Sequence, residues 1–406
     1  MKPICLLSVI ISFLFSCNPG PQKEVPPAPE DPLEFAYLRV KESLSLVSPR
    51  PENIPRTLEK GKLKTVKTSN WVSGFYPGLL WYIYDYSNEP EYLKLAKKWT
   101  GFLEAEKYND HTHDTGFIIN CSYGNGLRLM PLANPREIES YKKVIVLAAK
   151  ALSSRFNPKV GLLKSWDWNE KWQYPVIIDN MMNLELLFNA TRISGDSSFY
   201  HIAVTHAKTT IKTHFRPDGS SYHVVDFDPL TGEVNEKVTH QGAFDESAWA
   251  RGQAWGLYGF TVCYRETRDS VYLQKANEIA KFILSHPHLP EDMIPYWDFD
   301  AKDIPNTLRD VSAAAILASA FMELGTFNET EVDHIIPALK ILKSLSSPAY
   351  RAPLGSDHPF LLLHSVGSKP GNSEVDVPLI YADYYYLEAL IRKRNTLGDF
   401  DYMDYQ

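Results

Sequence analysis

The sequence predicts an all-α fold, an (α/α)6 barrel in which six helical hairpins close into a ring. Apolar residues recur at helical spacing in about twelve segments separated by Pro, Gly or Asn. Several hairpins share a short acidic turn followed by an aromatic residue and a helix with Ala on one face. An open solenoid would need polar capping helices and a steadier period, and two separate bundles remain an alternative. The expected helices are residues 33–48, 73–86, 90–106, 117–130, 137–153, 179–194, 197–213, 247–266, 271–285, 308–325, 330–346 and 378–393.

The composition agrees with a large buried core. The chain has 406 residues, of which 44% are hydrophobic and 13% aromatic, which excludes a disordered tail or a coiled-coil rod. Its net charge of −7 argues against a nucleic-acid binder, which needs a basic face. The length allows two or three domains, but a closed ring makes residues 33–406 a single domain. The aromatic content fits either an aromatic core or a groove that stacks sugar rings.

The first 17 residues form a targeting segment. Lys2 precedes a short apolar run that is too small to anchor the chain as a membrane-spanning helix. Residues 14–17 resemble a bacterial lipobox with Cys17 as the lipidated residue, although an ordinary cleaved signal is the alternative. The Pro-rich residues 18–32 are typical of a semi-rigid tether. We therefore expect a protein attached to a membrane through a lipid anchor, on the periplasmic side.

Two further predictions concern the remaining cysteines and the loops. Cys121 and Cys263 fit two separate buried thiols better than one disulfide, and no Cys pattern indicates a metal. The one strand signal is a hairpin over residues 221–238. Function is expected in the irregular segments at one end of the ring, which are residues 107–116, 154–178, 214–246, 286–307 and 348–377.

The first candidate site lies at residues 111–117. Two histidines, His111 and His113, adjoin Asp114, but their spacing fits a zinc site poorly and the chain has no His-Glu-x-x-His motif. A loop carboxylate before a Gly turn fits an acid in a cleft better. A simple helix N-cap by Asp114 is the alternative.

The second candidate is Asp179, which begins a helix together with Asn180 and Asn183. The following turns are wholly apolar, so this carboxyl is partly desolvated, and desolvation raises the pKa of an acid and suits it to proton donation. The helix dipole acts in the opposite direction. An N-cap role is again the alternative.

The third candidate is Arg251 with Trp255, four residues apart and so on one helix face. The guanidinium could hold a sugar carboxylate while the indole stacks on the ring. An Arg that merely covers a core Trp is the alternative. Trp71 is a second tryptophan at the start of a helix, and Thr239 and Gln241 lie in the loop before Arg251.

The fourth candidate is the loop around Ser365, Ser368 and Lys369. Its amides, hydroxyls and ammonium group suit an anion such as sulfate. It lacks the spacing of a phosphate-binding loop, and a plain loop is the alternative.

These segments together resemble the unsaturated glucuronyl hydrolases, glycoside hydrolase family 88. Two aspartates among aromatics, without a cofactor motif, already favour acid/base chemistry on a carbohydrate. The matching stretches run in order over about residues 35–395. They are Trp71-x-x-Gly74-Phe75-x-Pro77-Gly78, His113-Asp114-x-Gly116-Phe117, Ile178-Asp179-Asn180-Met181-Met182-Asn183, Thr239-His240-Gln241-Gly242, Arg251-Gly252-Gln253-Ala254-Trp255-Gly256 and His364-Ser365-Val366-Gly367.

The resemblance implies a glycosidase with no metal and no organic cofactor. Its substrate would be a lyase-generated oligosaccharide with a 4,5-unsaturated uronic acid at the non-reducing end. Asp179 matches the acid/base that protonates C4 and helps water add at C5, and Asp114 matches the second essential aspartate. The residues expected to hold the substrate are Trp71, His223, Thr239, Gln241, Arg251 and Trp255.

The resemblance also bears on sulfate and on location. Some family members recognise sulfate with a Ser-x-x-Ser-x-Lys loop, whereas here Lys369 comes one position early and Pro370 follows it. Glycosaminoglycan breakdown in a gram-negative periplasm agrees with the lipid anchor at Cys17. Two alternatives remain, an unsaturated rhamnogalacturonyl hydrolase acting on pectin fragments and a non-catalytic glycan-binding protein.

Overall fold

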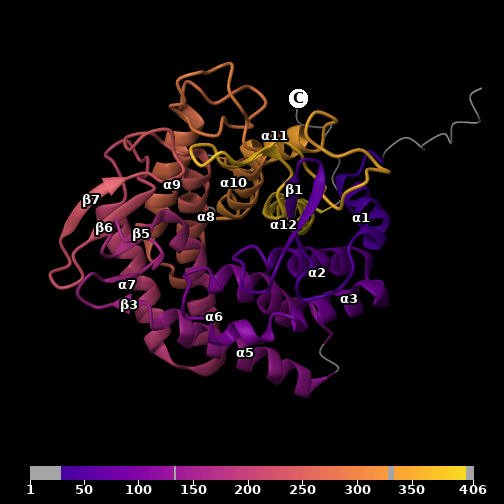
Figure 1. The fold of residues 1–406 in the computed structure, drawn as a ribbon, viewed down its shortest axis with the longest axis horizontal. Coiled ribbons are helices and arrows are strands. Elements are labelled where there is room, and N and C mark those ends of the chain that lie inside the picture. The colour runs from indigo at the N-terminus through magenta and orange to yellow at the C-terminus, as the bar shows by residue number, and fades with distance from the viewer. Residues whose placement is uncertain (1–28, 132–133, 328–332, 399–406) are drawn as a thin grey trace, which may run out of the picture.

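The computed structural model describes residues 29–131, 134–327 and 333–398, which form an (α/α)6 barrel (Figure 1). The expected helical segments are present, with ends displaced by a few residues. The α-helices are α1 (Pro32–Ser43), α2 (Phe75–Ser87), α3 (Pro90–Gly101), α4 (Asn125–Leu129), α5 (Pro135–Ser153), α6 (Leu184–Ser194), α7 (Ser197–Thr213), α8 (Ala250–Thr267), α9 (Ser270–Ser285), α10 (Val311–Leu324), α11 (Ile335–Leu345) and α12 (Ile380–Leu397). Tighter or wider helical turns are η1 (Leu44–Leu46), η2 (Glu104–Tyr108), η3 (Gly116–Gly124) and η4 (Ile178–Asn183).

Six helical segments form the inner ring. In order around the ring they are α2, η3 with α4, η4 with α6, α8, α10 and α12, and α12 packs back against α2. Helix α8 is buried continuously from Ala250 to Tyr264, and α10 is buried on every face except at Glu323. A helix that is buried on all sides needs small or apolar residues all round, and the Ala-rich sequence of α10 meets that need.

Among the outer helices, α1, α5, α7 and α9 begin at a side-chain cap. Asp196 accepts a hydrogen bond from the backbone N–H of Ser198 at the start of α7, and Asp269 does the same for Val271 at the start of α9. These aspartates are the acidic turns of the repeated sequence pattern. Their role is to satisfy backbone donors that the helix leaves unpaired.

Within the described ranges, the strands lie in small sheets at one end of the barrel. The expected hairpin is confirmed as β6 and β7, which join β5 in a three-stranded antiparallel sheet. The hairpins β1–β2 and β8–β9 were not expected from the sequence. The strands are β1 (Ile54–Glu59), β2 (Lys62–Val66), β3 (Phe156–Asn157), β4 (Leu162–Leu163), β5 (Pro175–Ile177), β6 (Val224–Phe227), β7 (Val234–Val238), β8 (Ser365–Ser368) and β9 (Ser373–Val377).

Cys121 and Cys263 are free and buried, as expected. Among the described residues, no helix has the length and apolar character needed to cross a bilayer. Cys17 and most of the Pro-rich tether lie outside the described residues, so the signal, the anchor and the domain limits at 17 and 32 stay predictions.

Candidate active site

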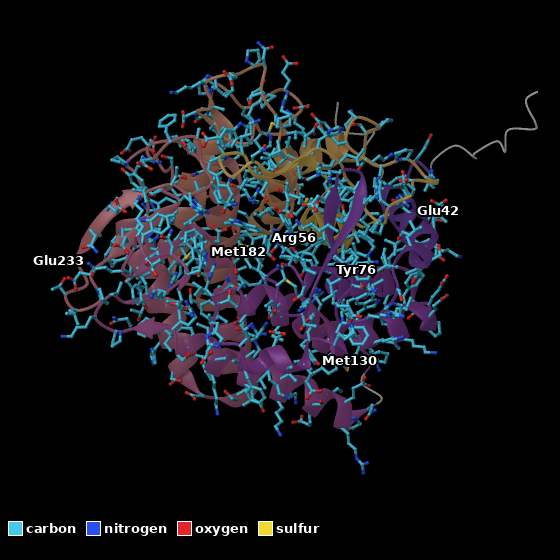
Figure 2. The ribbon with its side chains drawn as sticks, in the orientation of Figure 1. Glu42, Arg56, Tyr76, Met130, Met182 and Glu233 are labelled. Atoms are coloured by element: carbon cyan, nitrogen blue, oxygen red, sulfur yellow. The ribbon has the colours of Figure 1, made fainter. Side chains whose placement is uncertain are left out.

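A cavity of about 170 Å³ opens where the inner helices begin, and we call it the front cavity. Arg56 of β1 lies near the middle of the ring in Figure 2, whereas Glu42 and Glu233 lie at its margin. Four of the five irregular segments contribute to the front cavity, and residues 286–307 do not. The lining residues are Arg56, Trp71, His113, Asp114, Phe117, Trp166, Ile177, Asp179, Gln241, Arg251, Gly367, Ser368, Ser373, Glu374 and Tyr381.

The two aspartates are brought together by close packing of η3 on η4. Asp114 lies two residues before η3, and Asp179 is the second residue of η4. The side-chain oxygen of Asn183 accepts a hydrogen bond of 3.0 Å from the backbone N–H of Phe117. A Cβ atom on Gly116 would lie only 2.5 Å from that same oxygen, so this position needs glycine. Asn183 therefore fixes the register of one acidic segment against the other.

The pKa of each carboxyl group is raised to near neutral pH. Burial raises the pKa of Asp114 to about 7, against opposing effects of Thr112 and Arg155. Burial likewise raises the pKa of Asp179 to about 7; Arg251 opposes this shift and the charge of Asp114 adds to it. Acid/base groups work best when their pKa lies near the operating pH.

His113 favours the protonated form of Asp114. Its Nδ1 atom lies 2.9 Å from the carbonyl oxygen of Ser165, and a carbonyl only accepts, so Nδ1 carries the ring proton. Burial, aided by Arg155, lowers the pKa of His113 to about 3, so the ring is neutral at pH 7. The free lone pair on Nε2 lies 3.1 Å from Asp114 Oδ1. That contact is a hydrogen bond when Asp114 carries a proton.

His223 turns an N–H toward Asp179, whereas His113 turns a lone pair toward Asp114. The backbone N–H groups of His240 and Gln241 donate to its Nδ1 at 3.0 and 3.1 Å. Burial holds the pKa of His223 well below its usual value, so the neutral ring carries its proton on Nε2. This N–H lies 3.8 Å from Asp179 Oδ2. That separation is longer than a hydrogen bond, so His223 lies beside Asp179 as a neutral ring without donating to it in this structure.

The sequence led us to expect that the guanidinium of Arg251 is free to bind a sugar carboxylate. In the structure it is bonded within the protein instead. The guanidinium pairs with Asp310 at 2.9 Å and donates to the backbone carbonyls of Val366 and Gly367, and the side chain is 2% exposed. It stacks on Trp249 at 4.5 Å. Most of its donors are therefore already used, because a buried guanidinium needs a carboxylate and acceptors of its own.

The other candidates divide into three groups. Trp71, Gln241 and Ser368 line the front cavity. Trp255 lies beneath it, 1% exposed, against Phe117 and Tyr385. The remaining candidates, Thr239, Ser365 and Lys369, lie outside the lining.

The three candidates outside the lining lie directly after β7 or on the β8–β9 hairpin. The hydroxyl of Thr239 accepts from the backbone N–H of Gly242 at 2.7 Å and so shapes the turn that carries Gln241. Ser365 is buried in β8, and Lys369 is exposed at the turn between β8 and β9.

Sequence reasoning missed an ion pair and a tryptophan in the cavity wall. Arg56 binds Glu374 with both ends of its guanidinium and donates to Asn70 at 3.2 Å. Trp166 stacks near Trp172 at 5.7 Å and lines the cavity. In the described part of the chain, no group of three His, Cys, Asp or Glu side chains gathers where it could hold a metal ion.

The family model for Glycosyl Hydrolase Family 88 matches residues 51–267, more than half of the chain. The chain belongs to glycoside hydrolase family 88. It is therefore a glycosidase of the unsaturated glucuronyl hydrolase class, and the predicted (α/α)6 barrel is the fold of this class.

Several family 88 proteins are similar over most of their length. The unsaturated glucuronyl hydrolase of Formosa agariphila is 46% identical over 350 residues, 85% of this chain and 86% of the relative. The unsaturated chondroitin disaccharide hydrolase of Streptococcus agalactiae is 35% identical over 81% of this chain and 82% of its own.

Solved structures of unsaturated glucuronyl hydrolases are also similar to this chain over most of their length. An unsaturated glucuronyl hydrolase specific for heparin superposes with a TM-score of 0.86 at 43% identity, over 91% of this chain and 97% of its own. The Bacillus sp. GL1 enzyme, responsible for the degradation of glycosaminoglycan, superposes with a TM-score of 0.82 at 28% identity over the same shares.

Proposed function

We propose that the front cavity holds the 4,5-unsaturated uronic acid at the non-reducing end of a lyase-generated glycosaminoglycan oligosaccharide, and that Asp179 starts its release. The observation that carries this proposal is the pair of buried carboxyl groups, each with its pKa raised to about 7. The curated relatives, named as unsaturated glucuronyl and chondroitin disaccharide hydrolases, support this substrate class.

The chemistry consumes one water molecule. Protonated Asp179 gives its proton to C4 while the C4–C5 double bond supplies the electron pair, and positive charge develops at C5 and the ring oxygen. Water adds at C5 and returns a proton to the Asp179 carboxylate. The hemiketal so formed opens to a ketone at C5, and the hemiacetal left at C1 releases the aglycone as an alcohol.

In this scheme Asp114 and the two histidines, His113 and His223, influence which carboxyl group carries a proton. Asp114 shares its single proton with His113 Nε2, so it stays uncharged beside Asp179, and its other oxygen is an acceptor for a hydroxyl group. His223 offers its Nε2–H to Asp179 each time that carboxyl ionises. The planar wall of Trp71 and Trp166 suits the faces of the two sugar rings.

We propose further that the β8–β9 hairpin contacts a sulfate on the aglycone sugar. Ser368 faces the cavity, and the exposed ammonium group of Lys369 follows it at the turn. The likeness to a heparin-specific enzyme supports sulfated substrates. The likeness to chondroitin disaccharide hydrolases keeps unsulfated and chondroitin-type disaccharides within the test.

The lipid anchor at Cys17, on the periplasmic side of a gram-negative envelope, completes the proposal. It rests on the lipobox-like residues 14–17 and the Pro-rich tether. Full-length protein should fractionate with membranes and become soluble when Cys17→Ser is introduced. The anchor would be contradicted if the wild type and Cys17→Ser were distributed in the same way between the membrane and soluble fractions.

The experiment that tests the function follows the absorbance band of the unsaturated uronate. Heparin-lyase and chondroitin-lyase disaccharides should lose the band when the protein is added. Turnover restricted to unsaturated rhamnogalacturonan fragments would favour the pectin alternative. Saturable binding with no loss of the band for any unsaturated uronide would favour a glycan-binding protein.

A further inference from the structure

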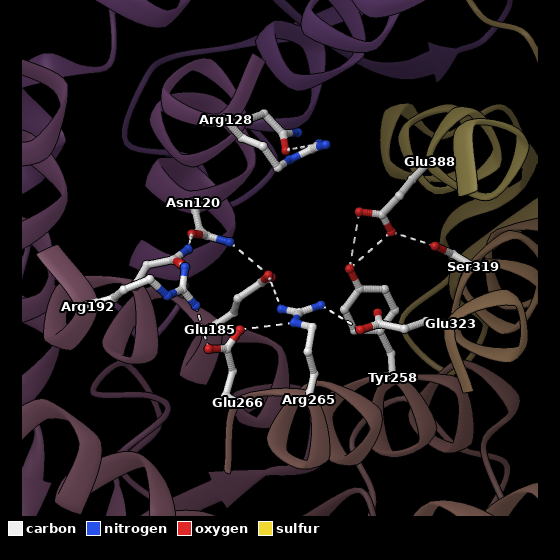
Figure 3. Close-up of polar contacts among 12 residues, drawn as sticks. Asn120, Arg128, Glu185, Arg192, Tyr258, Arg265, Glu266, Ser319, Glu323 and Glu388 are labelled. Atoms are coloured by element: carbon white, nitrogen blue, oxygen red, sulfur yellow. Dashed lines mark hydrogen bonds and ion pairs between the residues drawn. The ribbon is translucent and has the colours of Figure 1, made fainter. Parts of the chain in front are cut away.

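We propose that the end of the barrel opposite the catalytic aspartates holds a second binding site, for a small hydroxylated organic anion such as a sugar acid. The site is a cavity of about 730 Å³, which we call the rear chamber, and its polar side chains are shown in Figure 3. This volume lies in the range of ligand-binding pockets, which is roughly 300–1,000 Å³. The inference does not rest on the substrate proposed for the front cavity.

The rear chamber is separate from the front cavity. The front cavity uses the beginning of α8, at Arg251, whereas the rear chamber uses its end, at Arg265. Fourteen residues of helix place these positions about 21 Å apart along the axis. Between them lies a buried aromatic layer that includes Phe117, Trp255 and Tyr385, each at most 2% exposed. A ligand in one cavity therefore does not reach the other.

Charged side chains line the rear chamber, and the glutamates among them are satisfied. Arg265 forms ion pairs with three carboxylates, those of Glu185, Glu266 and Glu323. A buried network of this kind stabilises a fold no more than well-packed apolar residues would. The charges of the rear chamber therefore add little stability to the fold, which leaves ligand recognition as a reason for them.

The fourth glutamate obtains its hydrogen bonds mainly from hydroxyl groups. Glu388 accepts from Tyr82 at 2.7 Å, from Tyr258 at 3.0 Å and from Ser319 at 2.5 Å. Arg392 adds a longer ion pair to Glu388 at 3.6 Å. Four arginines and four glutamates line the chamber, and three of these arginines form ion pairs in the described part of the chain. The fourth guanidinium forms none.

The fourth guanidinium is that of Arg128. In the described part of the chain it is paired with no carboxylate; it donates to the amide oxygen of Asn125 at 3.0 Å and lies 5.7 Å from the ring of Tyr82. Figure 3 shows it facing the space that Glu185 and Glu388 border, and the side chain is exposed. A guanidinium with free donors binds carboxylate or sulfate groups in a fork.

The rest of the wall selects a hydroxylated ligand over a bare oxyanion. Each carboxylate has about four lone-pair positions, so Glu185 and Glu266 keep acceptors for hydroxyl groups after pairing with Arg265. Ile145 and Ile391 supply apolar surface for the C–H face of a ring. The combination of one free guanidinium, several acceptors and apolar patches fits a sugar acid.

Isothermal titration calorimetry of the full chain with sodium glucuronate, glucose and sodium sulfate tests the proposal. Glucuronate should bind saturably at millimolar concentrations, and glucose should not. Arg128→Gln should weaken glucuronate binding at least about tenfold, because it removes a charge-assisted hydrogen bond. Arg136→Gln, at an exposed arginine of α5 outside the chamber, should bind as the wild type does.

A thermal unfolding midpoint for each variant checks that Arg128→Gln is folded, as its exposed side chain leads us to expect. The proposal is overturned if the wild type shows no saturable binding of glucuronate or if Arg128→Gln binds it unchanged. Equal weakening by Arg136→Gln would also overturn it, because the binding would then be non-specific. Sulfate binding as tight as glucuronate binding would contradict an organic ligand.

Discussion

His113 Nε2 lies 3.1 Å from Asp114 Oδ1, and the other nitrogen of the same ring donates to the carbonyl oxygen of Ser165. A neutral imidazole with its proton on Nδ1 offers Asp114 only a lone pair. The carboxyl is therefore held as the acid. Asp179 instead lies 3.8 Å from the N–H of His223. The two aspartates thus have different histidine neighbours, while burial raises the pKa of both to about 7. Four predictions concern this site and the hairpin beside it.

The rate of hydrolysis should fall as pH rises through about 7. Asp179 must carry the proton that it gives to C4, and burial raises its pKa to about 7, so the active form is lost above that pH. The measurement is kcat/KM against pH on an unsaturated disaccharide. Asp114→Asn removes a nearby charge that raises this pKa, so its alkaline limb should lie at lower pH. A profile that is flat or rises from pH 6 to 9 would contradict this assignment.

Asp114→Asn should make the fold more stable at pH 8. The folded-state pKa of Asp114 is about 7, above the unfolded value near 4. The folded state therefore binds more protons between these values, and the wild type loses stability as pH rises through this window. An amide cannot ionise and still donates to His113. A difference of about 3 pKa units corresponds to about 4 kcal/mol, so we expect a gain of up to about 4 kcal/mol at pH 8 and a smaller one at pH 5.

Urea unfolding of both proteins at the two pH values measures this difference. Asp110→Asn, at a largely exposed aspartate of the same loop, is the matched control and should change stability little at either pH. A gain that is the same at pH 5 and pH 8 would show that ionisation of Asp114 is not its source.

Arg251→Met should destabilise the fold by about 3–5 kcal/mol, because it leaves the buried carboxylate of Asp310 without its cation. The double variant Arg251→Met/Asp310→Asn should lose less than the sum of the two single changes. Chemical denaturation of the three variants and the wild type completes the cycle. Additive losses would mean that Arg251 does not depend on Asp310 for its place.

Lys369→Ala should raise KM for sulfated disaccharides about three- to tenfold and leave KM for unsulfated ones unchanged, because an ammonium–sulfate contact exists only with the former. Lys302→Ala, at an exposed lysine in residues 286–307, is the control. Equal effects of Lys369→Ala on both kinds of disaccharide would remove the lysine from sulfate recognition.

The sequence predicted the helices well because their apolar residues recur locally and because five of them begin at an Asp or Asn cap. Asp114 and Asp179 were found for the same reason, since both lie where an apolar helical segment begins. Their roles remain predictions, but the structure places both in one cavity with Gln241 and Arg251. Such local signals survive in a single sequence.

Contacts between distant segments could not be predicted. Arg56 and Glu374 lie on β1 and β9, more than 300 residues apart, and neither segment shows a clear alternation of apolar residues. Arg251 and Trp255 do share a helix, but the nearest indole to Arg251 belongs to Trp249. The carboxylate of Asp310 decides where the guanidinium lies, and nothing in the spacing of α8 shows that carboxylate.

The rate of absorbance loss with Asp179→Asn tests the central claim most directly. Each protein is mixed with an unsaturated glycosaminoglycan disaccharide, and the uronate band is followed in a single turnover. An amide cannot protonate C4, so we predict a rate at least about 100-fold below that of the wild type. Calorimetry with the same disaccharide should show that the variant still binds it. A variant that binds the disaccharide and consumes the band at a rate close to that of the wild type would contradict the assignment of Asp179 as the acid.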